Sequence, residues 1–500
     1  MTFPMSALIV RLMLAGMVCL LPACRSVPAK HPKNAPVASA VNSPAPANDW
    51  LSSSQEKFQN GDVHGSLQIL QAAALSITDD YRIYYRMGAC YERLEDHAKA
   101  VDCYSRALAL HPTSVSYERR GYCYITLKNY EKALEDLNHV IELDGKGPNA
   151  NFYGSRAFAL VCLNRLPEAV ENASRSISLL PPGDPASVYA YRIRAEAFYK
   201  SGQFLAAIKD YDSLIALKPD AHELYFNRAL IYYQIGDLDS AISNLRRALA
   251  GNPADPRYNC QMGICLGKRG SFDNALIYFT KACDAEPSAI NLAARGFCYA
   301  AMNGQFRLSA LADLNSAIAL DKDTPHADWY RMRGRMKLAL GRKPEALWDY
   351  EKACDLGQND PDLYDATGWL LTELNRGNEA IAYLDRAILL NPKNLTYYEH
   401  KGIAYENAGQ LEKALSFFNQ VIALDPQRAM SYNNRGFFLL KQGKLNEAIK
   451  DFDHCIELDD LNGKAYINRG NAKAMKGDDV GAALDRALGS TRPPNGRLHP

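Results

Sequence analysis

The sequence lacks a strong charge of either sign. Its 57 Lys and Arg residues are balanced by 56 Asp and Glu residues, which leaves a formal net charge of +1. A surface of interspersed charges produces no field that would attract nucleic acid. The 500 residues are 47% hydrophobic and 23% charged, which is typical of an ordinary soluble fold. We therefore expect protein partners and no nucleic acid.

The chain also lacks the short motifs that mark common catalytic sites. It contains no glycine-rich phosphate loop after a strand pattern, no His-Glu-x-x-His and no serine nucleophile turn. Its ten histidines are scattered singly, as at His97, His139 and His454, which is typical of surface residues and not of metal ligands. We therefore predict that the protein is not an enzyme and uses no cofactor and no metal.

Long apolar runs are scarce, and the clearest one covers residues 12–21. As a helix it would be about 15 Å long, half of a hydrocarbon core, so it predicts a signal peptide over residues 1–23 and not a membrane span. The "LPAC" that follows resembles the lipobox of bacterial lipoproteins, which implies that Cys24 becomes the lipid-carrying first residue. Pro22 departs from that motif, so a plain cleaved signal and an uncleaved anchor remain alternatives.

The residues that follow Cys24 support an exported, tethered protein. Arg25 stands where an Asp would favour the inner membrane, so the resemblance implies an outer-membrane anchor facing the periplasm, with a soluble periplasmic protein as the alternative. Residues 24–48 are rich in Pro and Ala and predict a disordered tether. Ten further cysteines fit an oxidising compartment poorly.

Four of those cysteines follow a period that runs through the rest of the chain. A small residue recurs at intervals of 33 to 38 residues, most often 34. It is Gly88, Gly121, Ala157, Ala195, Ala229, Gly263, Gly296, Gly334, Gly368, Gly402, Gly436 and Gly470. Cys90, Cys123, Cys265 and Cys298 each lie two residues after it, so we interpret them as small buried side chains and not as disulfide partners.

Each period contains two amphipathic segments. In "YRMGACYERL" and "AVDCYSRALAL" the apolar and small residues recur at i, i+3, i+4 and i+7, which predicts a pair of helices. An Ala twelve residues after the first small residue, as at Ala100, lets the two helices approach closely. A proline such as Pro112 closes many units.

This 34-residue helix–turn–helix unit resembles the tetratricopeptide repeat. The resemblance covers residues 49–489, some 12–13 units, and implies an all-α solenoid that winds into a right-handed superhelix. Residues 490–500 would then be a disordered tail. Because the last unit lacks a polar cap helix, we also consider self-association through this C-terminal repeat, giving a homo-oligomer.

The family resemblance also implies a binding site. First helices of tetratricopeptide repeats line a concave groove that holds peptides or partner helices. The residue after the small position faces that groove in the family, and here it is mostly large and apolar. We predict a partner-binding groove formed by Tyr122, Phe158, Phe226, Leu230, Tyr233, Ile264, Phe297, Trp369, Ile403 and Phe437. The alternative is that the adjacent unit covers these side chains and they belong to the core.

The predicted function is a non-enzymatic scaffold or adaptor that is tethered in the bacterial envelope and binds proteins in its groove. Two alternatives remain open at this point. One is a docking regulator of an envelope enzyme such as a peptidoglycan hydrolase, and the other is a soluble adaptor without a lipid anchor.

Overall fold

We analysed a computed structural model that describes residues 50–493 except 148, 303 and 358. The predicted signal peptide, Cys24 and the tether lie outside the described residues, as do residues 494–500. The described part is α-helical and contains 26 helices and no strand, which confirms the all-α prediction. Within this part of the chain, no helix is long and apolar enough to cross a membrane.

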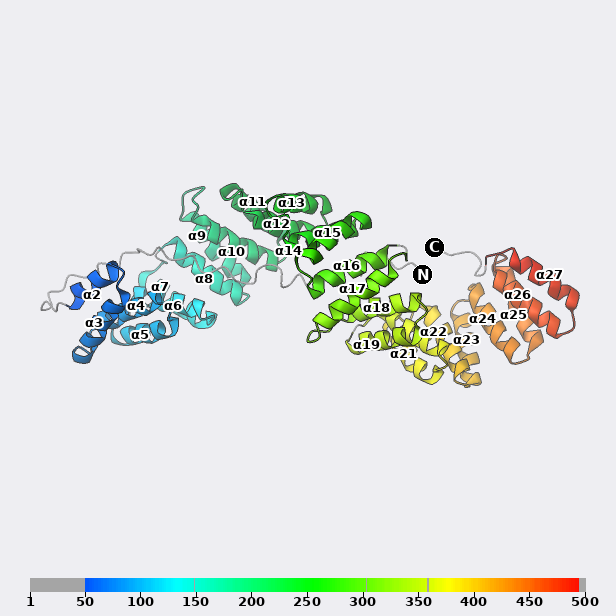
Figure 1. Ribbon diagram of the computed structural model, residues 1–500. Helices are drawn as coiled ribbons and strands as arrows, with labels where there is room; N and C mark the ends of the chain where they lie inside the picture. Colours follow the sequence, from blue (N-terminus) through cyan, green and yellow to red (C-terminus); the bar gives the residue numbers. More distant parts are fainter. Residues whose placement is uncertain (1–49, 148, 303, 358, 494–500) are drawn as a thin grey trace. The chain divides into compact units, whose positions relative to one another are not determined.

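The helices form consecutive pairs and fall into two compact units, with the boundary in the sequence between Ala285 and Glu286 (Figure 1). The N-terminal unit contains seven pairs. Its helices are α2 (Trp50–Gln59), α3 (Val63–Ser76), α4 (Tyr81–Arg93), α5 (His97–Leu110), α6 (Ser114–Thr126), α7 (Tyr130–Asp144), α8 (Ala150–Cys162), α9 (Leu166–Ser178), α10 (Ser187–Lys200), α11 (Phe204–Leu217), α12 (His222–Gln234), α13 (Leu238–Gly251), α14 (Pro256–Lys268) and α15 (Phe272–Ala285).

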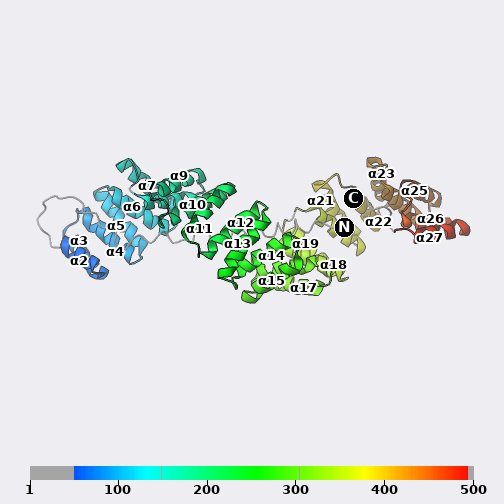
Figure 2. The ribbon, with the colours of Figure 1, turned by 90° about the horizontal axis from the view of Figure 1, so that it is seen from above.

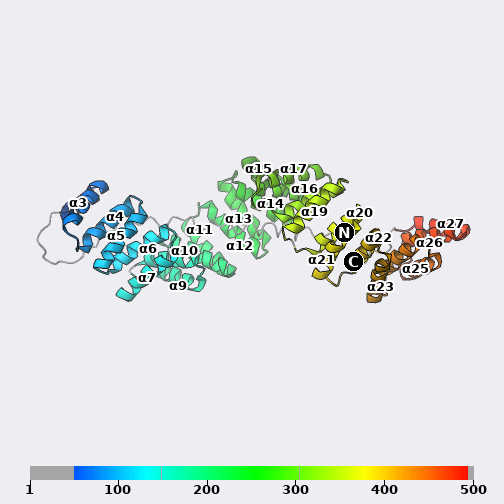
Figure 3. The ribbon, with the colours of Figure 1, turned by 90° about the horizontal axis from the view of Figure 1, so that it is seen from below.

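The C-terminal unit contains six pairs. Its helices are α16 (Ala289–Ala301), α17 (Arg307–Leu320), α18 (Ala327–Ala339), α19 (Lys343–Asp355), α20 (Pro361–Glu373), α21 (Gly377–Leu390), α22 (Leu395–Asn407), α23 (Leu411–Leu424), α24 (Ala429–Lys441), α25 (Leu445–Leu458), α26 (Gly463–Met475) and α27 (Asp479–Ser490). Figures 2 and 3 show the two helices of each pair side by side within their unit. Thirteen helix pairs confirm the predicted array of helix–turn–helix repeats.

The pair α4 and α5 shows how the sequence builds one repeat. The side chain of Asp80 accepts a hydrogen bond from the backbone N–H of Arg82 and caps α4, and Asp96 caps α5 in the same way. Between the helices, a Cβ at Gly88 would lie 2.7 Å from the ring of Tyr104. Glycine therefore lets this ring pack directly against the first helix, as the small residue was predicted to do.

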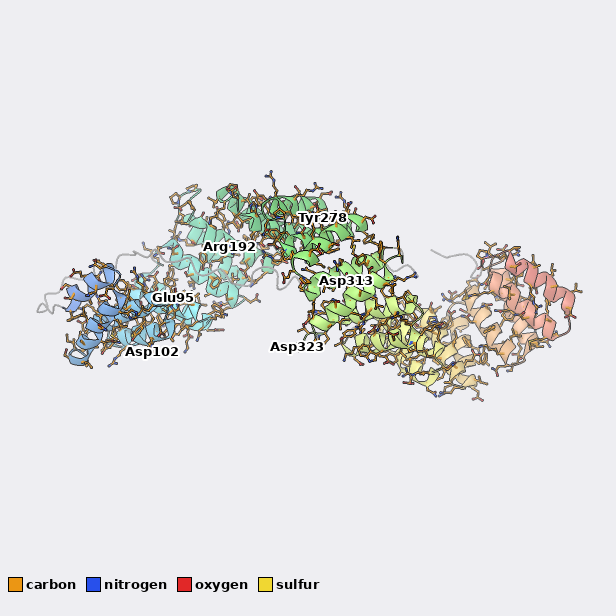
Figure 4. All side chains as sticks on the ribbon, in the orientation of Figure 1. Glu95, Asp102, Arg192, Tyr278, Asp313 and Asp323 are labelled. Carbon is orange, nitrogen blue, oxygen red and sulfur yellow. The ribbon has the colours of Figure 1, made fainter. Side chains whose placement is uncertain are left out.

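A polar ladder, which the sequence analysis did not predict, joins the two helices of most pairs. The Arg before the small residue of the first helix binds an Asp or Asn of the second helix, 16 or 18 residues later. The pairs are Arg120 with Asp136, Arg156 with Asn172, Arg194 with Asp210, Arg228 with Asn244, Arg295 with Asp313, Arg333 with Asp349, Arg435 with Asp451 and Arg469 with Asp485. Figure 4 labels one of these acids, Asp313 of α17.

Three repeats lack both halves of the ladder, and one keeps only the cation: Lys401 has Phe417 at the acid position and binds Asp385 of the preceding helix instead. Where the cation is replaced by Met87, Met262 or Thr367, the acid is also replaced. The residues at the acid position are then Cys103, Tyr278, which Figure 4 labels, and Tyr383. This correlation has a physical cause. A half-buried charge without its partner destabilises the fold, whereas an apolar pair at the same two positions leaves no charge unpaired.

The cysteines that follow the repeat are core residues. Cys90, Cys123, Cys265 and Cys298 are all buried, and no disulfide joins any of these four to another described cysteine. Burial also disfavours the thiolate and raises the pKa of Cys265 to about 12. The interpretation of these residues as small packing side chains is confirmed.

The helical array extends further toward the C-terminus than expected. Helix α27 ends at Ser490, and the next residues fold back onto the start of α26. The Nε of Arg492 donates to the carbonyl of Asp460 at 2.8 Å, and the N–H of Gly463 donates to the carbonyl of Pro493 at 2.9 Å. Residues 490–493, at the start of the predicted tail, thus include the end of α27 and contacts with the segment that begins α26.

Candidate partner-binding face

Seven of the ten predicted groove residues are buried, which corrects the expectation of a long solvent-facing strip. They are Tyr122, Phe158, Phe226, Leu230, Tyr233, Ile264 and Phe297. Neighbouring first helices cover them. The ring of Phe226 in α12 lies 4.7 Å from that of Tyr258 in α14, and the ammonium group of Lys268 lies 4.7 Å from the ring of Tyr233. For these seven residues, the alternative that they are core side chains is the better description.

The other three predicted residues, Trp369, Ile403 and Phe437, remain accessible. They lie at the same place on three successive first helices of the C-terminal unit, α20, α22 and α24. Trp369 and Ile403 are half-buried, and Phe437 is 41% exposed. We call these three residues the C-terminal face. They form a short apolar strip in place of the ten-residue strip that the sequence predicted.

Polar pairs between successive first helices border this face. Nδ1 of His400 lies 2.7 Å from a carboxylate oxygen of Asp365, which joins α22 to α20, and the His400 ring lies 4.6 Å from that of Trp369. At Phe437, the ammonium group of Lys441 lies 4.7 Å from the ring. The same ammonium binds Glu406 of α22 at 3.0 Å.

Two further contacts hold the first helices in register. Glu399 of α22 is buried and accepts hydrogen bonds from Arg428 and from the hydroxyl of Ser431. In the next junction, the amide of Asn468 in α26 donates to Asn433 in α24 at 3.0 Å. These contacts fix the spacing of the helices that carry the C-terminal face, so the face is preorganised and needs little ordering to bind a ligand.

The equivalent positions on the flanking first helices are polar. Arg335 of α18 is exposed and forms no ion pair with any residue that the structure describes. Asn471 of α26 accepts two hydrogen bonds from Arg486. The C-terminal face therefore has an unpaired guanidinium at one end and an amide at the other. In the part of the chain that the structure describes, no three His, Cys, Asp or Glu side chains are grouped to hold a metal ion.

Several curated proteins are similar to parts of this chain. A TPR repeat-containing protein of Methanocaldococcus jannaschii is 26% identical over 253 residues, which is 49% of this chain and 43% of that protein. DnaJ homolog subfamily C member 3 of Rattus norvegicus is 25% identical over 186 residues, 34% of this chain and 36% of the relative. The chain thus matches less than half of the length of either relative.

Solved structures with a similar arrangement of helices also share little sequence. A tetratricopeptide repeat protein from Parabacteroides merdae is 22% identical, with a TM-score of 0.41 over 51% of this chain and 97% of that one. A chain of the APC/C hetero-tetramer Cut9-Hcn1 is 13% identical, with a TM-score of 0.34 over 88% of this chain and 96% of that one.

The family assignment comes from models of the repeat itself. Models described as tetratricopeptide repeat match residues 81–114, 115–146, 194–256, 235–290, 299–361, 366–429 and 417–450. These matches cover more than half of the chain and lie within the array of helix pairs described above. The chain belongs to the tetratricopeptide repeat family.

Proposed function

We propose that this protein is a non-enzymatic scaffold that binds an extended segment of a partner protein on its C-terminal face. The observation that carries the proposal is the line of three accessible apolar side chains, Trp369, Ile403 and Phe437, on helices held in register by polar pairs. Accessible aromatic side chains on a rigid support are typical anchors of protein interfaces.

The spacing of the face favours one class of ligand. Equivalent residues on neighbouring packed helices lie about 9–10 Å apart. A polyproline II segment rises about 3.1 Å per residue and returns to the same side every third residue, so its side chains repeat at about 9 Å. We therefore infer a ligand with apolar side chains at every third position and an acidic residue that pairs with Arg335.

Peptides selected from a random displayed library against the full chain test this proposal. The triple substitution of Trp369→Ala, Ile403→Ser and Phe437→Ser should weaken binding of a selected peptide several hundred-fold, since the two aromatic anchors contribute about 2 kcal/mol each. Fluorescence anisotropy measures the affinity. Leu389→Ser is the control, because Leu389 is 70% exposed on the second helix α21. Equal affinity for the triple variant and the parent chain would place the binding site elsewhere.

We further propose that the scaffold is anchored by a lipid on Cys24 and faces the periplasm from the outer membrane. The support is the signal-like residues 1–23 and the "LPAC" sequence, together with Arg25. Cys24→Ala should abolish labelling of the protein by a clickable palmitate analogue in the native host, because no other residue would carry the acyl chain. Labelling that persists in this variant would contradict the anchor, and Cys90→Ala, at a buried thiol, serves as the control.

A further inference from the structure

The last helix, α27, carries exposed branched aliphatic side chains at two places where each other repeat has at most one. Val480 is 84% exposed and Leu484 is 61% exposed. The corresponding residues of the preceding repeat, 34 positions earlier, are Asn446 and Lys450. Elsewhere in the described chain, no helix carries branched aliphatic residues at both of these places. With Ala483 and Ala487, which are also exposed, they form a continuous apolar stripe along α27.

The edge of α27 on which a further repeat would stack is polar. Arg486 takes the place of the buried Phe452, and Ser490 takes the place of Ile456. A fourteenth repeat of the same kind would have to bury this guanidinium among apolar side chains, which is unfavourable. This edge is therefore unlike the edges on which the preceding repeats stack, and the apolar stripe lies outside it.

Two opposite charges flank the stripe on one side. Asp479 and Arg486 are seven residues apart, so they lie on the same side of the helix. Both are exposed, and neither forms an ion pair with a described residue. The guanidinium of Arg486 donates only to the amide oxygen of Asn471, at 3.0 and 3.2 Å. The charges of this flank are thus available to a partner.

We infer that α27 is a self-association surface on which two copies of this chain pair with their last helices antiparallel. A two-fold axis across the stripe packs Val480, Ala483, Leu484 and Ala487 of one copy against the same residues of the second copy. The same operation brings Asp479 of each copy beside Arg486 of the other. Along the helix axis, Asp479 of one copy and Arg486 of the other remain offset by about 3 Å, which an arginine side chain can span. In a parallel pair the two-fold axis would run along the helices and place the two charged flanks on opposite sides of the interface, so these ion pairs would not form.

This surface is small, so the dimer should be weak. One twelve-residue helix per copy provides an interface at or below the lower end of the standard range of about 1,200–2,000 Å². Self-association should therefore depend on concentration in the micromolar range. Anchoring of the chains in one membrane would raise their effective concentration and favour the pair.

Sedimentation equilibrium of the full chain tests the inference, with Cys24→Ala included so that a lipid cannot drive association. We expect dimers at about 100 µM, as for a small interface. Leu484→Asp should weaken association about tenfold or more, because each dimer would bury two carboxylates in its apolar centre. Leu205→Asp is the control, since Leu205 is 70% exposed at the register position of Val480 in α11.

Charge exchange tests the antiparallel geometry. Asp479→Lys and Arg486→Glu should each weaken the dimer about three- to tenfold, and the double variant should restore it, because the ion pairs re-form with their signs exchanged. A chain that stays monomeric, an effect of Leu205→Asp equal to that of Leu484→Asp, or no recovery in the double variant would each overturn the inference. So would dimers that form only after deletion of residues 494–500, since that tail and not a second copy would then cover α27.

Discussion

Replacing Asp349 with alanine is expected to lower the free energy of unfolding of the C-terminal unit by about 3–5 kcal/mol. Asp349 is fully buried between α18 and α19, where its carboxylate lies 2.6 Å from Arg333 and 2.9 Å from Lys337. Its removal leaves Arg333 partly buried without an anion, and leaves Lys337 with only a long contact to Glu345 at 3.9 Å. Hydrogen exchange of peptides from α18 and α19 measures the loss locally, which is necessary because a long repeat array does not unfold in a single two-state step.

Glu379→Ala provides the matched control for this effect. Its carboxylate also binds a cation, Arg376, but both side chains are exposed, 57% for Glu379 and 41% for Arg376. Exposed ion pairs contribute about 0–1 kcal/mol, so this variant should unfold nearly as the parent chain does. A similar loss of unfolding free energy in both variants would show that burial does not determine how much an ion pair contributes to stability.

The protein contains its own replacement for the Asp349 cluster. In the repeat of α14 and α15, the places of Arg333, Lys337 and Asp349 are taken by Met262, Leu266 and Tyr278. Transfer of these three residues into α18 and α19 should recover at least half of the stability lost in Asp349→Ala, because an apolar set leaves no charge unpaired. Further destabilisation by the triple variant would mean that the joint loss of both charges has another cause.

The repeat period predicted the helix pairs because that information is local and occurs in every unit. A small residue and an Ala twelve residues later set the approach of two helices that are adjacent in sequence. Gly88 and Tyr104 illustrate this, since their contact lies within one repeat. The ladder was equally accessible, because Arg and Asp recur 16 residues apart, but it emerges only when the repeats are compared with one another and not only with the family pattern.

The local pattern within one repeat did not determine which of the predicted groove residues are exposed. Whether a first-helix side chain reaches solvent depends on the side chains of the next repeat, as Phe226 depends on Tyr258. At Phe437 the next first helix places the small polar Asn471 at the equivalent position, and the ring stays accessible. The same repeat position can therefore be buried in one repeat and exposed in another, and sequence register alone does not distinguish the two cases.

Substitution of Gly377 is expected to give a second large loss of stability, although the residue introduced is the one that the neighbouring repeats carry. The neighbouring repeats carry Leu411 and Leu445 at its position, yet we expect Gly377→Leu to destabilise the C-terminal unit by about 3 kcal/mol, the upper end for overpacking. A Cβ at Gly377 would lie 2.6 Å from the carbonyl oxygen of Ala404 in α22. Because this obstacle is backbone, α22 itself would have to move. Hydrogen exchange of α21 and α22 measures the loss.

Gly267→Ala separates this steric effect from the ordinary effect of replacing glycine. Gly267 lies inside α14, and a Cβ there would meet no atom within 4 Å. The substitution should be neutral or stabilise the helix by up to about 1 kcal/mol, because alanine restricts the unfolded chain and favours helix. Gly377 also donates its N–H to the side chain of Asn407 at 3.0 Å, so a displaced α22 would lose this bond as well. If Gly377→Leu were as stable as the parent chain, the close approach of α21 and α22 would not require glycine, and the small residue at position 377 would be only a departure from the repeat pattern.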